Sequence, residues 1–255
     1  MVKLVKDVKK GRIKSAYVFA YFDIAKFKLE ANNYKIISVE QNAELRIQEG
    51  KDASVSTKGN RTREGFIWVP KEDSLYFTFN SLIMDSPSEA TRENRKGRQF
   101  YIKDKQKAKA LLKSVKINYN KESVPVKELH NDEVTAQIFG KSAQKYGEFL
   151  KDAGINEVPF WFFDKDYVKS QDGPFVTQLW FDYLSSRSGL GGSWCLSSSN
   201  GVRGVLENAI GIESKNLHYT RKDLRDVERE YNKLLKILQP NQIGKIGGLI
   251  EKLKQ

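Results

Sequence analysis

Residues 132–155 read DEVTAQIFGKSAQKYGEFLKDAGI, and this stretch predicts two short helices joined at Gly140. Glycine can take the positive φ that a tight turn requires, and Ser142 follows as a residue suited to cap a new helix. Apolar residues recur at helical spacing on one face of each segment. They are Ala136, Ile138 and Phe139 in the first segment and Tyr146, Phe149 and Leu150 in the second.

With a small residue at Ala136, a turn glycine at Gly140 and a cap at Ser142, this stretch resembles the helix-turn-helix of DNA-binding regulators. The resemblance is limited to residues 132–155, and the same pattern also fits an ordinary αα-hairpin. It implies that the exposed residues of the second helix face the DNA major groove. Those residues are Lys141, Ser142, Gln144, Lys145 and Glu148.

The formal net charge of +12 and the pI near 9.5 indicate a polyanionic partner, of which nucleic acid is the commonest. A lysine-rich surface that only aids solubility is the alternative. The basic segment 1–14 is interpreted as an arm that orders on phosphate, and residues 85–98 as a long exposed loop. The expected phosphate contacts on that loop are Arg92, Arg95, Lys96 and Arg98.

The fold class expected from these patterns is α+β. Segments rich in β-branched and aromatic residues predict strands at 16–24, 26–31, 34–40, 43–49, 65–69 and 75–84, and a helix is expected over 103–115. Residues 158–184 predict a two-stranded hairpin, which would form the wing of a winged helix-turn-helix. The predicted domains are a β-rich region with a basic N-terminal arm, 1–120, and a helical winged-helix region, 121–255.

The end of the chain predicts an amphipathic helix that begins near Thr220, with Asp223 in its first turn. Its apolar stripe offers a contact with the core or with a second copy in a homodimer. The stripe consists of Leu224, Val227, Tyr231, Leu234, Leu235 and Leu238.

One group of residues has the composition of a catalytic site. Glu213 and Lys215 end a short apolar segment and resemble the Glu-x-Lys half of the site in restriction-type nucleases. That resemblance implies that Asp182 and Glu213 hold Mg²⁺ while Lys215 orients the attacking water. A surface salt pair is the alternative interpretation.

The sequence therefore predicts a site-specific double-stranded DNA-binding protein that needs no cofactor. The alternatives are a Mg²⁺-dependent DNA endonuclease and an RNA-associated basic structural protein. A single cysteine, Cys195, excludes an internal disulfide, and two histidines, His130 and His218, disfavour a histidine-rich metal site. Without a long apolar run or a signal peptide, no membrane partner is expected, and a cytoplasmic location is predicted.

Overall fold

The computed structural model describes residues 2–72, 74–117, 121–184, 188–192, 196 and 201–206. The chain forms two compact units, Met1–Ile210 and Gly211–Gln255. The first unit contains all of the described residues. The predicted C-terminal helix lies in the second unit, outside the described residues.

In the described part of the chain, twelve strands form one mixed sheet whose main path runs β1-β2-β12-β4-β10-β11-β9-β8. The remaining strands pair beside this path: β3 with β12, β5 with β4 and β7, and β6 with β10. The strands are β1 (Leu4–Val8), β2 (Ser15–Phe19), β3 (Tyr34–Ile36), β4 (Asn60–Val69), β5 (Ser74–Thr78), β6 (Phe100–Tyr101), β7 (Ser114–Ile117), β8 (Ser123–Pro125), β9 (Glu157–Trp161), β10 (Phe175–Phe181), β11 (Leu190–Gly191) and β12 (Gly201–Leu206).

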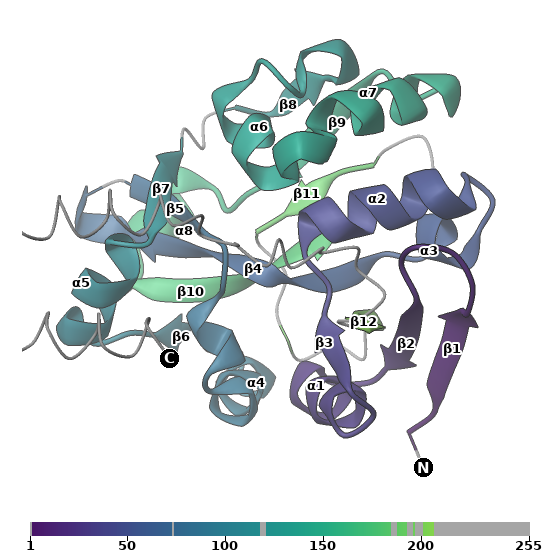
Figure 1. The fold of residues 1–255 in the computed structure, drawn as a ribbon. Coiled ribbons are helices and arrows are strands. Elements are labelled where there is room, and N and C mark those ends of the chain that lie inside the picture. The colour runs from purple at the N-terminus through teal and green to yellow at the C-terminus, as the bar shows by residue number, and fades with distance from the viewer. Residues whose placement is uncertain are drawn as a thin grey trace, which may run out of the picture. The chain divides into compact units, whose positions relative to one another are not determined.

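Helices cover both faces of the sheet centre, with α2, α6 and α7 on one side and α1 and α4 on the other (Figure 1). The α-helices are α1 (Phe22–Glu30), α2 (Val39–Glu49), α3 (Ser54–Thr57), α4 (Pro87–Arg95), α5 (Asp104–Leu111), α6 (Glu133–Phe139), α7 (Ala143–Asp152) and α8 (Lys165–Lys169). Short 3-10 turns are η1 (Pro70–Glu72), η2 (Leu82–Met84), η3 (Val126–Glu128) and η4 (Gly140–Ser142). Within the described residues, no helix has the length and apolar character needed to cross a membrane.

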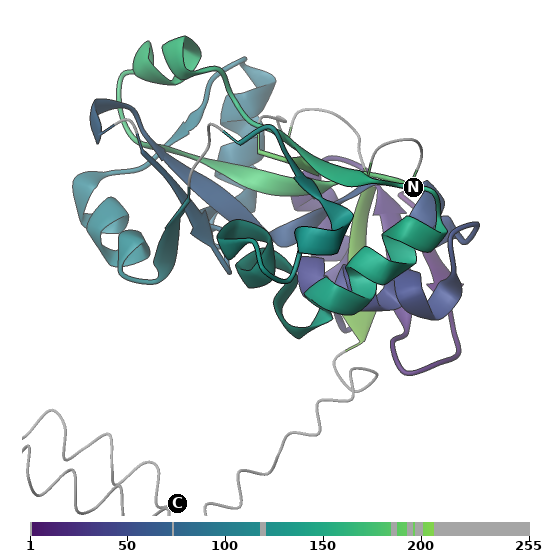
Figure 2. The same ribbon diagram turned by 90° about the horizontal axis from the view of Figure 1, so that it is seen from above.

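The central pair of strands, β4 and β10, runs side by side through the sheet (Figures 1 and 2). Because successive side chains of a strand point to opposite faces, β4 contributes to two cores. Phe66 and Trp68 pack with α2, α6 and α7, whereas Ile67 and Val69 pack with α1 and α4. A strand buried on both faces shows a continuous apolar run, as FIWV does.

Two of the predicted N-terminal strands are helices instead. In α2, Ser38 and Gln41 form a reciprocal capping box, with each side chain accepting from the other residue's backbone N–H. In α1, Phe22, Ala25 and Leu29 are buried at helical spacing. Partial alternation of apolar and polar residues in segments this short also fits a helix. The Ser38–Gln41 capping box and the helical spacing of Phe22, Ala25 and Leu29 were therefore the more specific signals.

The expectation of an α+β fold with a winged helix-turn-helix is wrong: the chain has a large mixed sheet. The predicted wing does not form a hairpin, because α8 separates β9 from β10. β9 pairs with β8 and β11, and β10 pairs with β4, β6 and β11. The predicted basic loop 85–98 contains helix α4, which begins with Pro87 in its first turn, a position that favours proline.

A fully buried arginine, Arg46, joins α2 to α7 and to the segment that follows β10. Its Nη1 donates to the Tyr146 hydroxyl at 3.0 Å and to Ser188 Oγ at 3.3 Å, and its Nη2 donates to the Asp182 carbonyl. The guanidinium also lies 4.0 Å from the centre of the Phe181 ring. Three segments distant in sequence are therefore connected through one side chain.

Replacing Arg46 with alanine is expected to lower the free energy of unfolding by about 3 kcal/mol or more, because it leaves a cavity and buried hydroxyl and carbonyl groups without their donor. Urea denaturation measures this change. The matched control is Arg92→Ala on the exposed surface of α4, which should change stability by less than about 0.5 kcal/mol. Equal effects of the two variants would contradict the assignment.

A buried carboxyl group, Glu64, makes stability depend on pH. Burial raises its pKa to about 7, although Arg63 and the backbone N–H of Val39 oppose the shift. The folded state therefore binds this proton more tightly than the unfolded state. The stabilisation is complete below the unfolded pKa, near 4.5, and is lost as the pH rises through about 7.

We expect Glu64→Gln to remove this dependence. Relative to the variant, the wild type should lose about 3 kcal/mol of unfolding free energy between pH 4 and pH 8, which corresponds to the change in pKa. Urea titrations of both proteins across this range measure the difference. Parallel stability curves would show that Glu64 does not titrate in the native state.

Candidate ligand pocket on the N-terminal hairpin

Alternate residues of β1 and β2 form a pocket on the outer face of their hairpin. The antiparallel register pairs Val5 with Tyr17 and Leu4 with Val18, so Lys3 comes opposite Phe19. Val18 points into the core with α1, and Tyr17 and Phe19 therefore point to the other face. We name the cavity lined by Lys3, Val5, Tyr17, Phe19 and Lys58 the hairpin pocket; its volume is about 390 Å³.

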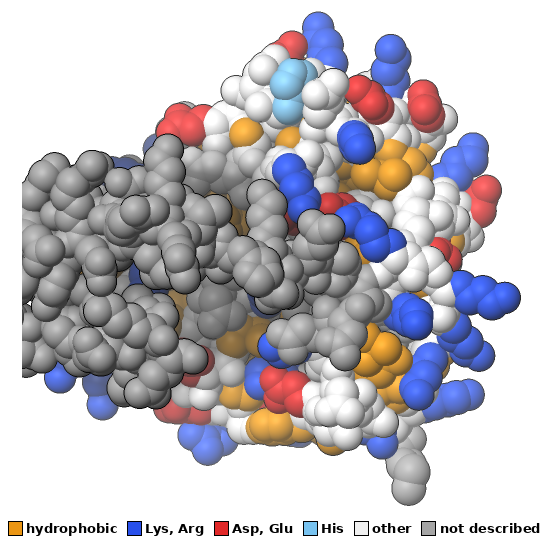
Figure 3. Space-filling view, in the orientation of Figure 1, with side chains coloured by type: hydrophobic (Ala, Val, Ile, Leu, Met, Phe, Trp, Pro, Cys, Tyr) orange, Lys and Arg blue, Asp and Glu red, His pale blue; other side chains and the backbone are white. Residues whose placement is uncertain are grey.

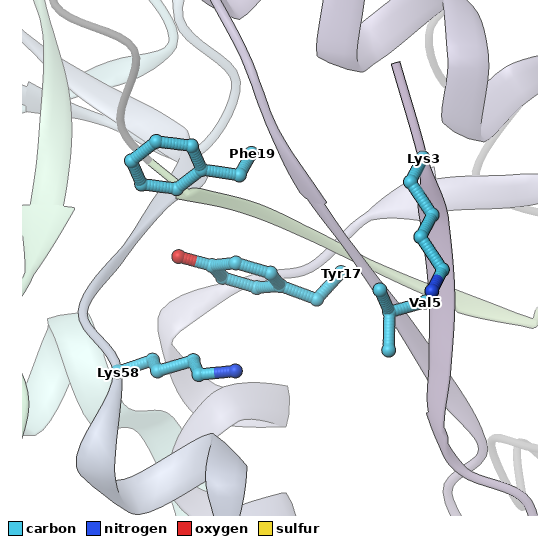
Figure 4. Close-up of a pocket in the computed structure, with 5 residues that line it drawn as sticks. All are labelled: Lys3, Val5, Tyr17, Phe19 and Lys58. Atoms are coloured by element: carbon cyan, nitrogen blue, oxygen red, sulfur yellow. The ribbon is translucent and has the colours of Figure 1, made fainter. Parts of the chain in front are cut away.

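The hairpin pocket combines aromatic and cationic side chains. Figure 4 shows the Tyr17 ring between the side chains of Phe19 and Lys58. Lys58 Nζ lies 5.4 Å from the centre of the Tyr17 ring, a distance typical of a cation–π contact. Phe19 is 63% exposed, so the pocket presents a large apolar surface to solvent. Such a surface is suited to contact with a ligand.

Contacts beneath the hairpin pocket hold Tyr17 in place. The Tyr17 hydroxyl donates to the Gly59 carbonyl at 3.4 Å, and Arg203 lies 5.3 Å from the ring centre. Burial raises the pKa of this hydroxyl above its usual value, and the Arg203 guanidinium opposes the shift. Tyr17 is therefore a neutral, oriented aromatic side chain at physiological pH.

A buried ion pair supports the same region. Arg203 Nη1 donates to Asp7 Oδ1 and to Ser15 Oγ, both at 2.8 Å. Asp7 also accepts from Ser15 Oγ at 3.2 Å and from Ser54 Oγ at 3.0 Å. The carboxylate thus connects β1, β2, β12 and α3 beside the pocket, because Arg203 is paired with Tyr17 and shares its face of the strands. Buried charges are tolerated only with such partners.

The end of β10 lies next to the hairpin pocket. A side chain placed on Gly59 would overlap the Trp180 ring, which shows how closely β10 approaches the residue after Lys58. Trp180 Nε1 donates to Asp182 Oδ1 at 3.3 Å. Burial raises the pKa of Asp182, while the Tyr183 backbone, Trp180 and Arg46 oppose the shift.

The hairpin that carries the pocket is rich in exposed cations. Lys and Arg side chains gather over the β1–β2 hairpin in the space-filling view (Figure 3). The contributing exposed residues are Lys3, Lys6, Lys9, Lys10, Arg12 and Lys14. Of these residues only Lys3 lines the pocket, together with Lys58, whereas Arg12 at the turn of the hairpin pairs with Glu44. The two lysines of the pocket attract acidic ligands.

The predicted DNA-reading residues lie at α7, but acidic residues of α2 lie beside the start of this helix. The backbone N–H of Lys141 donates to Glu40 Oε1 at 3.1 Å, and Ser142 Oγ donates to Glu44 Oε1 at 3.2 Å. Lys141 Nζ is 3.9 Å from Glu44. Two carboxylates therefore already interact with Lys141 and Ser142.

The remaining predicted α7 residues are exposed, and two of them bond to each other. Gln144 Nε2 donates to Glu148 Oε1 at 3.2 Å, while Lys145 is exposed between them. The opposite face of α7, with Tyr146 and Leu150, is buried in the core. The helix pair in 132–155 is therefore present, and it packs as a core element.

The predicted phosphate-binding residues lie on α4 and the turn that follows it. Glu93 is 3.0 Å from Lys96 Nζ and 3.7 Å from both Arg92 and Arg98. Arg95 lies 4.8 Å from the centre of the Tyr21 ring. Three of the four cations thus lie near the carboxylate of Glu93 in the same chain. The hydrogen bond from Lys96 lowers the pKa of Glu93.

Of the predicted catalytic residues, the structure describes only Asp182; Glu213 and Lys215 lie outside the described residues. Among the residues that are described, no three His, Cys, Asp or Glu side chains come together as metal ligands. The Asp182 side chain instead accepts from the Trp180 indole.

Comparison with known proteins identifies the fold. No family model matches the chain, and no curated protein matches it. The chain is similar to a solved structure described as "Accommodation of massive sequence variation in Nanoarchaeota by the C-type lectin fold". The TM-score is 0.58 at 17% identity, over 78% of this chain and 98% of the other. The chain therefore has a C-type lectin fold.

This fold corrects the prediction of a double-stranded DNA-binding protein and, with it, the nuclease and RNA-binding alternatives. The similarity is to a C-type lectin fold, and α7 is built into its core instead of projecting as a reading head. The basic composition suggested a polyanion, but composition does not show where the charges lie. At α7, Glu40 and Glu44 accompany the cations.

Sequence reasoning missed the hairpin pocket, because residues 1–14 were interpreted as an arm. A signal was present in the spacing. Lys3 and Val5 are two residues apart before Gly11, and Tyr17 and Phe19 are two residues apart after it, so each pair would share one face of a strand. Gly11 has φ of +89°, as the turn of a hairpin often requires. Alternation on both sides of a glycine predicts paired strands.

The close approach of β12 to Tyr17 requires glycine at position 201. A Cβ atom there would lie 1.6 Å from the Tyr17 hydroxyl oxygen. We expect Gly201→Ala to destabilise the protein by several kcal/mol, on the order of other overpacked sites. In a Tyr17→Ala background the same change should cost much less. Thermal denaturation of the four proteins measures this coupling, and additive losses would refute the contact.

Proposed function

We propose that this chain is a recognition protein that uses its C-type lectin fold as a rigid scaffold and binds an acidic polypeptide segment at the hairpin pocket. The observation that carries the proposal is the combination of exposed Phe19 with Lys3 and Lys58 in one cavity. An exposed aromatic side chain and two lysines that line one cavity are suited to a carboxylate with an apolar neighbour.

The chemistry of the hairpin pocket favours a polypeptide. Val5 and Phe19 supply apolar contact area, and the two lysines supply charge without fixing a planar geometry. An Asp or Glu side chain beside an aromatic or aliphatic residue matches both features. Because the lysines are exposed, the charge contribution should weaken as salt screens it.

In this scaffold, the residues that hold the strands together differ from the residues that would contact a ligand. Buried Arg203 and partly buried Asp7 hold the strands together beside the pocket, while Phe19 and Lys58 are exposed. The similar Nanoarchaeota structure is described as accommodating massive sequence variation in this fold. By analogy, exposed pocket residues of this chain can be replaced with little loss of stability, and binding specificity would change with them.

The test is selection of random short peptides, displayed on phage, against the immobilised protein. The wild type should enrich peptides in which Asp or Glu neighbours an aromatic or aliphatic residue. Phe19→Ala combined with Lys58→Ala should weaken binding of such a peptide at least about tenfold, as expected for loss of a central aromatic anchor and a charge. Fluorescence anisotropy of the labelled peptide measures the change.

The matched control removes an exposed aromatic residue and a lysine elsewhere, Phe27→Ala with Lys145→Ala. The control should bind the selected peptide as the wild type does, and both double variants should keep the wild-type melting temperature within about 2–4 °C. Enrichment of no acidic motif, or equal loss in the two variants, would refute the proposed function.

A further inference from the structure

A second cavity, of about 590 Å³, lies between the end of β5 and helix α5, and it shares no residue with the hairpin pocket. We name it the α5 pocket. Its volume is within the usual range of small-molecule sites. The lining combines an aromatic ring, two amides, two lysines and one carboxylate: Phe79, Asn80, Asp85, Gln106, Lys109 and Lys113, with Thr78, Leu82 and Ala110.

The sequence itself places these groups together. Gln106, Lys109 and Lys113 follow one another at intervals of three and four residues, so they lie on one side of α5 and of the turn that follows it. The antiparallel register pairs Thr78 of β5 with Ser114 of β7. Phe79 and Lys113, the next residues outward, therefore meet across the mouth of the pocket.

Several contacts hold the β5 side of the pocket in a fixed conformation. The Phe79 ring packs edge-on against the buried Phe77 ring, with centres 5.1 Å apart. Thr78 Oγ1 donates to the Asn80 carbonyl at 2.7 Å. The turn before Asp85 is capped by Ser81 Oγ, which accepts from the Ile83 backbone N–H at 3.3 Å. Preorganised groups lose less entropy when a ligand binds.

We infer that the α5 pocket binds a polyhydroxylated acid, a sugar-like ring that carries several hydroxyl groups and one acidic group. Phe79, 46% exposed, offers its ring to the C–H face of the ligand. Asp85 and the amides of Asn80 and Gln106 can accept from and donate to hydroxyl groups. Lys109 and Lys113 attract the acidic group, and Gln106 lies beside them, while Asp85 and Asn80 lie on the β5 side of the same cavity.

Two sources share this ligand chemistry: the uronic acid units of an acidic polysaccharide and a free sugar phosphate. The experiment titrates isotope-labelled full-length protein with galacturonate, oligogalacturonate, glucose 6-phosphate, glucose and inorganic phosphate, and follows the backbone amide resonances of Phe79, Asn80 and Lys113. Both acidic sugars should shift these resonances with dissociation constants of roughly millimolar order for a single ring.

Two variants locate the site. Lys109→Ala with Lys113→Ala should weaken binding of glucose 6-phosphate at least about tenfold. Lys141→Ala with Lys145→Ala removes two exposed lysines at the same spacing on another surface and should leave binding unchanged. Native amide spectra of both variants show that the loss does not come from unfolding.

The outcomes separate the possibilities. Tighter binding of oligogalacturonate than of galacturonate supports a polysaccharide ligand, and preference for glucose 6-phosphate supports a free metabolite. Inorganic phosphate binding as tightly as glucose 6-phosphate, glucose binding as tightly as either acid, or unshifted resonances would each overturn the inference. Because the two pockets share no residue, these results are independent of peptide binding at the hairpin pocket.

Discussion

The buried guanidinium of Arg46 is the interaction on which the arrangement of this protein depends. It bonds to a hydroxyl on α7, to Ser188 and to the carbonyl of Asp182, and it lies against the Phe181 ring. A charge removed from water is tolerated only when its donors find acceptors. This requirement fixes α2, α7 and the end of β10 relative to one another, and it excludes arrangements in which α7 projects from the core.

The same principle operates at β12. Arg203 pairs with Asp7 and lies against the Tyr17 ring. The protein thus uses buried arginines to fasten strands whose outer side chains remain exposed. Stability and recognition are assigned to different side chains of the same strand, which is the property that a binding scaffold needs. Glu64 adds a carboxyl group whose burial makes stability sensitive to pH near 7.

The two pockets differ in chemistry because different elements build them. The hairpin pocket comes from alternate residues of two strands, which place lysines beside aromatic and aliphatic side chains. The α5 pocket comes from one side of a helix that faces a loop, and its polar groups are more varied. Each pocket is lined by two lysines, in a chain with a net charge of +12, so both attract acidic groups. The other side chains that line each pocket then determine which acidic ligand fits.

The sequence by itself determined the local features: the run FIWV as a strand, the helices on each side of Gly140, and the basic charge. Local patterns also held signals that were misread, such as the Ser38–Gln41 capping box of α2. Only the tertiary structure decided which faces are exposed. Glu40 and Glu44 meet the start of α7 from about one hundred residues away, and Lys58 joins Tyr17 from another element. Such contacts depend on how the elements pack, which periodicity along the chain does not encode.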